Sequence, residues 1–282
     1  MITIRNDILT VKIAKRGAEI KSIVKDNTEY IYPSQPAIWN KSAPLLFPIC
    51  GSVKENTYTH KGKTYHMDKH GFAQFMTYEV ESRSETSAVF LLRESEETLA
   101  QYPFAFALRV IYELEGCALK VTYSVENHSD EEMFFSIGAH EGYYTPEGIE
   151  DYDIHFETPV TLDHTPLLGP LVTNERIRML TDGYVFPLYE KFFVTDALVF
   201  ENVATKALTL RNRKNGKAIK VDFPFAKNLL LCHKPSAPYL CIEPWAGIPD
   251  RIGTTYELGE KEDILSLAPS GEYRGEHTIT IL

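Results

Sequence analysis

Apolar and polar residues alternate along much of this chain. The alternation is clearest over residues 9–13, 106–114 and 118–126, where an apolar side chain recurs at every second position. A period of two places these side chains on one face of an extended strand, so that face can be buried while the other meets water. The pattern therefore predicts half-buried antiparallel strands in these three segments.

Short turn sequences separate segments of this kind. Asn215-Gly216 favours the positive backbone angles of a tight reversal, and the other two turns also contain glycine. Each turn joins two strand-like segments, which predicts three β-hairpins. The three turns are Glu115-Gly116, Lys61-Gly62-Lys63 and residues 212–216.

Helical periodicity is scarce, and short helices are predicted only near residues 95–101 and 174–181. The 16 prolines and 16 glycines are spread along the chain, and neither a linker nor an internal repeat is visible. Many evenly spaced strands have to bury their apolar faces against a second sheet. We therefore predict an all-β fold, a large antiparallel β-sandwich with few short helices, formed as a single domain by residues 1–282.

Residues 145–190 are the least regular part of the sequence. We predict that they form long loops over one face of the sandwich. Because loops on a rigid scaffold often carry binding residues, this stretch is expected to contribute to a site.

Composition and charge narrow the function. Hydrophobic residues make up 44% of the 282 positions, which is enough for a sizeable core. The formal net charge of −10 leaves no basic excess to attract a phosphate backbone, so no nucleic-acid partner is expected.

The N-terminal residues lack a basic stretch followed by an apolar core, and no apolar run is long enough to cross a bilayer. We expect a cytoplasmic protein without a membrane partner, either a monomer or a homodimer.

The four cysteines show no Cys-x-x-Cys spacing, and three of them lie in apolar stretches. Buried free thiols are therefore predicted rather than disulfides or zinc ligands. The residues are Cys50, Cys117, Cys232 and Cys241.

Glu243 is the first candidate for chemistry. It follows the apolar run Tyr239–Ile242 and precedes Pro244-Trp245. A carboxylate at the end of so apolar a strand is rarely buried without a partner or a task. Desolvation would raise its proton affinity, which suits a general base near neutral pH. The competing interpretation is a structural glutamate bonded to a backbone amide.

Two histidines stand in comparable surroundings. His140 follows an apolar strand, and the Glu141 that comes directly after it is expected to favour the imidazolium, which can donate a proton. His70 is preceded by Lys69, whose charge is expected to lower the proton affinity of the ring, so a neutral hydrogen-bonding role is predicted. A purely structural role is the competing interpretation for both.

Other chemistries fit the sequence less well. A zinc site made from His66, His70 and His140 lacks the ligand spacing of known metal motifs. Nucleophilic catalysis by Cys232 or Cys241 beside His233 needs an activated thiolate, but both cysteines lie in apolar runs that suppress it. We therefore expect neither a metal ion nor an organic cofactor.

Aromatic residues make up 12% of the chain, and several flank the segments just described. Most aromatic residues of strands pack in a core. A ring that borders a cleft, however, packs well against the apolar face of a pyranose. The candidates for such a contact are Phe72, Tyr143 and Trp245.

The sequence resembles the aldose 1-epimerase family of the galactose mutarotase-like superfamily, and within it the LacX-type branch, because these motifs follow one another in the family's order. The likeness extends over nearly the whole chain. The segments that carry it are residues 44–51, the motifs around His70 and His140, Asp196–Phe200 and Glu243-Pro244-Trp245.

The resemblance implies a galactose mutarotase-like supersandwich with a sugar cleft on one sheet, which interconverts the α and β anomers of a free aldose without a cofactor. By this analogy Glu243 takes the proton from the anomeric hydroxyl, while His140 protonates the ring oxygen. His70 binds the substrate and stabilises the charge that develops on it. Asp196 holds a sugar hydroxyl.

Departures from the family pattern leave alternatives open. Glu141 stands where relatives often have proline, and Ser52 and Gln74 stand where many have arginine. The alternatives are a hexose-6-phosphate 1-epimerase, and a carbohydrate-binding or regulatory protein without turnover. The missing arginines weaken the case for a phosphorylated sugar. The lysines that would form a phosphate patch instead are Lys41, Lys54, Lys69 and Lys191.

Overall fold

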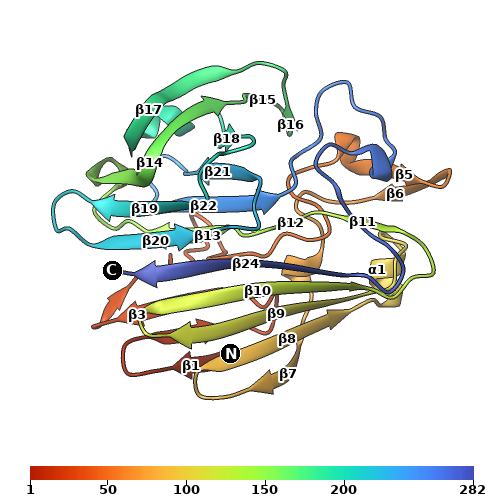
Figure 1. Cartoon of the computed structure of the whole chain (residues 1–282), viewed down its shortest axis with the longest axis horizontal. Coiled ribbons are helices and arrows are strands. Elements are labelled where there is room, and N and C mark those ends of the chain that lie inside the picture. The colour runs from red at the N-terminus through yellow and green to blue at the C-terminus, as the bar shows by residue number, and fades with distance from the viewer.

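A computed structural model describes all residues, 1–282, and its regular secondary structure consists almost entirely of antiparallel strands (Figure 1). The predicted all-β fold is confirmed, and so is the short helix near residues 95–101. That helix is α1 (Glu96–Leu99), whose N-cap Ser95 accepts a hydrogen bond from the amide of Thr98. The other helical elements are 3₁₀ turns at Lys54–Asn56, Ala73–Phe75, Ile149–Asp151, Glu190–Phe193 and Leu258–Glu260.

One sheet of 14 strands forms the main body of the molecule. Its central strand β24 separates the β7–β10 half from the half that contains β14 and β22 (Figure 1). In spatial order, the strands are β12 (Ile137–Gly138), β22 (Tyr239–Ala246), β21 (Asn228–Cys232), β18 (Leu198–Phe200), β14 (Tyr152–His164), β19 (Ala207–Asn212), β20 (Ala218–Asp222), β24 (Glu272–Ile281), β10 (Ala118–Asn127), β9 (Phe106–Glu115), β8 (Ser87–Arg93) and β7 (Glu79–Arg83), with β13 (Glu141–Tyr144) beside β22 and β17 (Ile177–Pro187) beside β14.

A second, four-stranded sheet packs against one end of the large sheet and makes the molecule a sandwich. Ile4 and Val11 from the small sheet and Val110 and Val121 from the large one are fully buried in a shared cluster of 63 apolar residues. The small sheet consists of β1 (Ile2–Arg5), β2 (Thr10–Ile13), β3 (Ile20–Lys25) and β4 (Thr28–Glu29), and the remaining strands form the pairs β5 (Thr57–His60) with β6 (Lys63–His66), β11 (Met133–Phe135) with β23 (Leu265–Leu267), and β15 (Leu167–Leu168) with β16 (Leu171–Val172).

The three predicted hairpins are present. They are β9–β10, β5–β6 and β19–β20, each in antiparallel register across its turn. In the turn between β5 and β6, Lys61 and Gly62 both have positive φ angles, of 49° and 73°. Turn residues and alternation thus specified these pairings locally.

Residues 145–190 differ from the prediction. Instead of long loops they contain the long strands β14 and β17, and the helix predicted near residues 174–181 is absent because β17 begins at Ile177. The register between the two strands shifts after His155, Val160 and Leu162, which interrupts the period of two. Most of β17 is also exposed, so its sequence lacks the apolar alternation by which strands are recognised.

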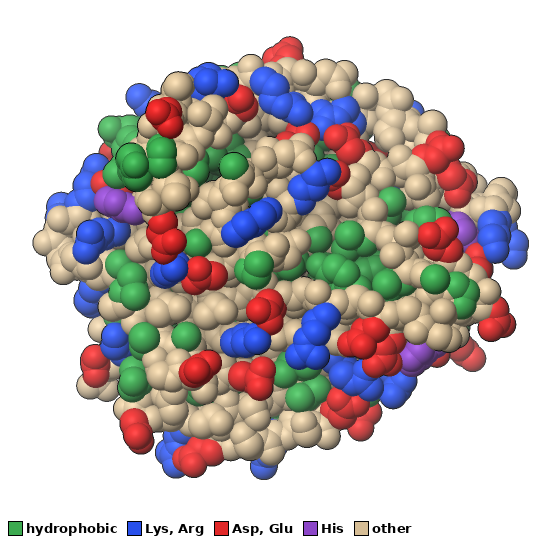
Figure 2. Space-filling model, in the orientation of Figure 1, with side chains coloured by type: hydrophobic (Ala, Val, Ile, Leu, Met, Phe, Trp, Pro, Cys, Tyr) green, Lys and Arg blue, Asp and Glu red, His purple; other side chains and the backbone are tan.

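All four cysteines are free, as predicted, but only Cys50 and Cys241 are buried, whereas Cys117 and Cys232 are half-buried. No helix combines the length and apolar character needed to cross a membrane. On the face of the molecule in Figure 2, lysine and arginine side chains are interspersed with aspartate and glutamate, and no continuous basic tract runs across it.

Candidate active site

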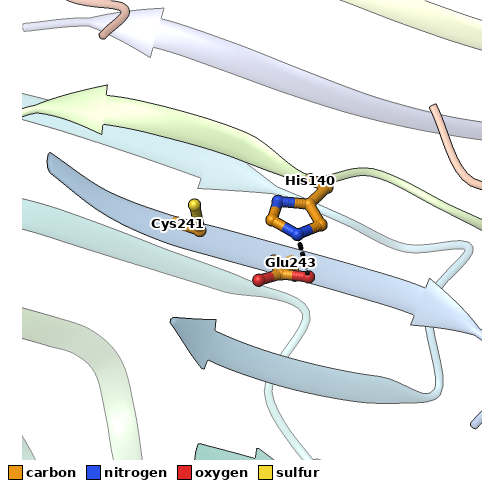
Figure 3. A group of neighbouring side chains, drawn as sticks. All are labelled: His140, Cys241 and Glu243. Atoms are coloured by element: carbon orange, nitrogen blue, oxygen red, sulfur yellow. Dashed lines mark ion pairs between the residues drawn. The ribbon is translucent and has the colours of Figure 1, made fainter. Parts of the chain in front are cut away.

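Strand β22 is the platform of the candidate site. Every residue from Tyr239 to Ala246 is buried, and the strand is paired at both edges, with β12 and β13 on one side and β21 on the other. Glu243 projects from this strand, and His140 comes from the short connection between β12 and β13. Figure 3 shows the imidazole of His140 lying over β22, with its Nε2 atom 3.3 Å from Oε2 of Glu243.

His70 reaches the same place from the loop that follows β6. Its ring lies 5.5 Å from the ring of His140 and 5.6 Å from that of Trp245, measured between centroids, and is nearly perpendicular to both. The three residues that were predicted to carry the chemistry therefore line one pocket, which Asp196 and Trp245 also border.

Burial controls the proton affinity of Glu243. Its side chain is 3% exposed, and burial raises the pKa of this carboxyl to about 8, while the nearby ammonium of Lys69 lowers it. The polar partner of the carboxyl is His140 rather than a backbone amide. The structural interpretation of Glu243 that the sequence left open is not realised.

The expectation that Glu141 would favour the imidazolium of His140 is wrong. Consecutive residues of an extended chain point to opposite sides, so Glu141 is directed into the core, where Oε1 lies 3.2 Å from Nε2 of His277. Burial lowers the pKa of His140 to about 3 instead. Trp39 covers this imidazole, with 5.3 Å between the ring centroids, and the Nδ1 atom of His140 is buried without a hydrogen-bond partner.

The backbone fixes the orientation and tautomer of His70. The amide of Gly51 donates a hydrogen bond to Nδ1 at 3.1 Å, so in the neutral ring the proton resides on Nε2. Burial, with the nearby His140 and Lys69, holds the pKa of His70 well below its usual range. His70 is therefore a neutral hydrogen-bond donor, as the sequence predicted.

Two glycines allow these side chains to come together. Gly71 has a φ of 67°, and a Cβ atom on it would lie 2.3 Å from the carbonyl oxygen of Phe47. A Cβ on Gly138 would lie 2.5 Å from the indole of Trp245. The loop that carries His70 and the strand that precedes His140 thus pack closely because these residues lack side chains.

Two of the predicted sugar contacts lie elsewhere. Phe72 is 4% exposed and packs on Phe47 and Phe106, while Tyr143 is fully buried in the same core cluster. Neither residue lines the pocket. Their positions next to the histidine motifs reflect core packing, because chain neighbours of a site residue commonly face the interior.

Trp245 and Asp196 do line the pocket. The indole N–H of Trp245 donates to the carbonyl oxygen of Ala139 at 3.1 Å, so the ring offers an apolar surface rather than a donor. Asp196 is exposed, and its Oδ1 accepts a hydrogen bond from the amide of Ala197 at 2.7 Å. Its other oxygen atom has no such partner among the protein atoms and is available to a ligand hydroxyl.

Sequence reasoning missed two wall residues, Leu167 and Pro170, which the β15–β16 hairpin contributes to the pocket. Lys69, which the sequence offered as the charged neighbour of His70 and as part of a phosphate patch, also lines the pocket. Trp39 lies about 100 positions before His140, and only the tertiary structure places it over that ring.

The lysines proposed for a phosphate patch are dispersed. Lys69 alone among them lines the pocket. Lys41 donates to Oε1 of Gln74 at 2.7 Å, Lys54 lies over the ring of Tyr256, and Lys191 lies over the ring of Tyr189. The other position where relatives carry arginine, Ser52, is buried and does not line the pocket.

The assemblies set aside on sequence grounds do not form. His66 is exposed on β6 and hydrogen-bonds Thr57, so it does not join His70 and His140. His233 follows the last residue of β21, and its Nδ1 atom is bonded to the carbonyl oxygen of Tyr239 rather than to a cysteine. A different group of possible metal ligands does gather in the site: one atom each from His140, Cys241 and Glu243, all within 4.8 Å of one another (Figure 3).

Comparisons with known proteins show similarity along the whole chain. The family described as Aldose 1-epimerase matches residues 1–263. Protein LacX of Lactococcus lactis subsp. lactis, in its plasmid and chromosomal forms, is 30% identical over 296 residues, which covers 100% of this chain and 99% of the relative.

Solved structures share the fold. A galactose mutarotase related enzyme from Lactobacillus acidophilus superposes with a TM-score of 0.94 at 36% identity and covers 100% of this chain and 97% of its own. A galactose mutarotase-like protein from Lactobacillus casei gives 0.93 at 28% identity, with 100% of both chains covered. The galactose mutarotase-like sandwich expected from the sequence is confirmed.

Proposed function

Because the chain belongs to the aldose 1-epimerase family, we propose that it interconverts the α and β anomers of a free aldose by opening and reclosing the pyranose ring. The observation that carries this proposal is the contact between Nε2 of His140 and Oε2 of Glu243 at 3.3 Å, in a pocket bordered by His70, Asp196 and Trp245. Two groups that exchange protons meet there beside a ring that suits a sugar face.

Ring opening moves two protons and breaks one bond. Glu243 takes the proton of the anomeric hydroxyl, and His140 delivers a proton to the ring oxygen as the bond between the anomeric carbon and that oxygen breaks. Rotation about the bond between the first two carbons turns the aldehyde over. Reclosure runs the same steps in reverse, with Glu243 returning its proton to the carbonyl oxygen, and yields the other anomer.

The pKa values of the pair suit this cycle. With the pKa of His140 near 3 and that of Glu243 near 8, the two groups together hold a single proton across the range between. Opening starts with that proton on His140 and ends with it on Glu243, and reclosure transfers it back. Burial favours the proton on Glu243, so the positive charge of Lys69 and the sugar hydroxyls have to stabilise the carboxylate when opening begins.

The other pocket residues position the sugar. His70 donates from Nε2 to an oxygen that gains negative charge, because Gly51 already occupies Nδ1. Trp245 packs against a face of the pyranose, and Asp196 accepts a hydrogen bond from a hydroxyl. A cytoplasmic location and a small sugar as the partner belong to the same proposal.

Polarimetry on freshly dissolved α-glucose, α-galactose and further aldoses tests the proposal. We expect Glu243→Gln to lower the catalysed rate by about 10²–10⁴-fold while sugar binding, measured by calorimetry, persists. The exposed Glu79 on the edge strand β7 provides a control, and Glu79→Gln should leave the rate unchanged. Mutarotation equally fast with and without protein for every aldose would refute the proposal.

The same assays separate the alternatives. Sugar binding without any rate acceleration would indicate a binding or regulatory protein. A clear preference for glucose 6-phosphate over glucose would indicate a phosphorylated substrate, although Lys69 is the only one of the four proposed lysines in the pocket. We therefore expect the free sugar to react faster.

A further inference from the structure

Cys241 has no part in the proton transfers, yet it lies beside the two groups that carry them. It precedes Glu243 by two positions on β22, so both side chains project from the same face of the strand. A ligand atom of Cys241, one of His140 and one of Glu243 lie within 4.8 Å of one another (Figure 3). The thiol is free and buried.

We propose that Cys241, His140 and Glu243 form a binding site for a thiophilic divalent metal ion, represented by Zn²⁺. Thiolate, imidazole and carboxylate are the three ligand types that zinc takes in proteins. Three protein ligands leave the fourth tetrahedral position open to a water molecule or another ligand.

The distances support tetrahedral coordination. Zinc binds imidazole nitrogen at about 2.0–2.1 Å and carboxylate oxygen at about 2.0–2.2 Å, which separates two such ligands by about 3.3 Å at the tetrahedral angle. Nε2 of His140 and Oε2 of Glu243 are already 3.3 Å apart. With a sulfur bond of about 2.3 Å, the thiolate would need to lie roughly 3.5 Å from both. The three ligand atoms lie within 4.8 Å of one another, so the side chains have to move closer when the ion binds.

Charge also favours the site. Binding displaces the proton of the buried Cys241 thiol and that of the Glu243 carboxyl into solvent. The resulting thiolate and carboxylate each contribute one negative charge, and a neutral imidazole contributes none, so together they cancel the two positive charges of the ion. A complex with no net charge is the form that a buried pocket tolerates best. The side chain of His140 is 13% exposed, which leaves a route from the pocket to the coordinating atoms.

Occupancy would stop proton transfer, because the ion holds the nitrogen and the oxygen that exchange protons. This consequence rests on the proposed function, whereas binding of the ion does not. We therefore test binding first, by a signal that needs no activity.

The test is a titration of the reduced chain with Co²⁺, which substitutes for Zn²⁺ in zinc-binding sites. When a thiolate coordinates Co²⁺, the complex absorbs in the near ultraviolet through a charge-transfer band. We expect a band that saturates at one Co²⁺ per chain and disappears when Zn²⁺ is added. Cys241→Ala should abolish the band, whereas Cys117→Ala, which removes a remote half-buried thiol, should retain it. Glu243→Gln keeps the thiol and should weaken Co²⁺ binding by at least ~10-fold.

Absence of a thiolate band in the unmodified chain, or its persistence in Cys241→Ala, would overturn the proposal. If Cys241→Ala does not fold, the Glu243→Gln titration decides, and unchanged Co²⁺ affinity in that variant is the contrary result. In the activity assay, Zn²⁺ should slow mutarotation and a chelator should restore it. A chain that binds Co²⁺ through Cys241 but never accelerates mutarotation would leave the metal site intact and refute only the enzymatic role.

Discussion

In the proposed mechanism, the single proton shared by Glu243 and His140 makes the reaction sensitive to alkali. The pKa of Glu243 is raised to about 8, and above that value the pair loses its only proton, leaving a carboxylate and a neutral imidazole. No group then remains to protonate the ring oxygen. We expect the catalysed rate at low sugar concentration to be level near neutral pH and to fall about tenfold per pH unit above the pKa. Polarimetry from pH 6 to 10, corrected for the spontaneous rate, checks this, and a rate that keeps rising through pH 10 would contradict it.

Lys69 adjusts that pKa. Its ammonium lines the pocket and lowers the pKa of the Glu243 carboxyl by electrostatic attraction. Removing the charge in Lys69→Met should therefore raise the pKa and move the alkaline fall in rate to higher pH. Lys191→Met is the matched control, because Lys191 lies over the ring of Tyr189 outside the pocket. A shift of the fall to lower pH, or an equal shift in both variants, would show that Lys69 does not act on Glu243.

At the scale of elements, the loop that presents His70 depends on a close approach of two backbones. Gly71 and Gly62 both have left-handed φ angles, of 67° and 73°, but only at Gly71 would a Cβ atom meet another backbone, the carbonyl of Phe47 at 2.3 Å. Alanine at Gly62 should cost about 1 kcal/mol of unfolding free energy from the φ angle alone. Gly71→Ala should lower the unfolding free energy clearly more, because the loop has to move away from Phe47. The movement also displaces His70, so mutarotation should become slower. Urea unfolding of both variants measures the difference, and equal costs would mean that the contact is unimportant.

Local sequence patterns predicted those elements whose partners lie next to them in the chain. The β9–β10 hairpin follows from alternation and from the turn at Gly116, both of which act within a few residues. Strands β14 and β17 were missed because their register shifts and the exposure of β17 remove the period of two. Rules that use only neighbouring residues cannot predict such a strand pair, because contacts with the rest of the sheet compensate for its irregularities.

The site was predictable to a similar extent. Glu243 and His140 were recognisable as ionisable groups in apolar runs, and the structure brings them together. The direction of Glu141 follows from strand alternation, which would have excluded it as the partner of His140. The position of the Trp39 ring over the imidazole of His140 was not predictable, because this contact depends on the whole fold.

At the scale of the whole molecule, the sandwich buries its reactive pair at a cost in stability. The carboxyl of Glu243 has its ordinary pKa near 4.5 when unfolded and a raised value near 8 when folded. Between those values the folded chain holds a proton that the unfolded chain has released. Stability contributed by this proton is complete below about pH 4.5 and is lost as pH rises through 8. The raised proton affinity of Glu243 that the proposed mechanism uses therefore makes the fold less stable as pH rises from about 4.5 to 8.

Glu243→Gln removes this titration and should stabilise the fold. The neutral amide keeps the shape of the protonated carboxyl, so the variant and the unmodified chain should unfold at similar temperatures at pH 5. At pH 8.5 the variant should be more stable by an amount on the order of a few kcal/mol, which corresponds to several degrees in the midpoint of thermal unfolding. Glu79→Gln, at an exposed position, should show no such growth of the difference with pH. The contrary result is a Glu243→Gln variant that is less stable than the unmodified chain at pH 8.5. The Glu243 carboxyl would then ionise in the folded protein with little loss of stability. In that case its pKa is not raised, and the single-proton mechanism loses its physical basis.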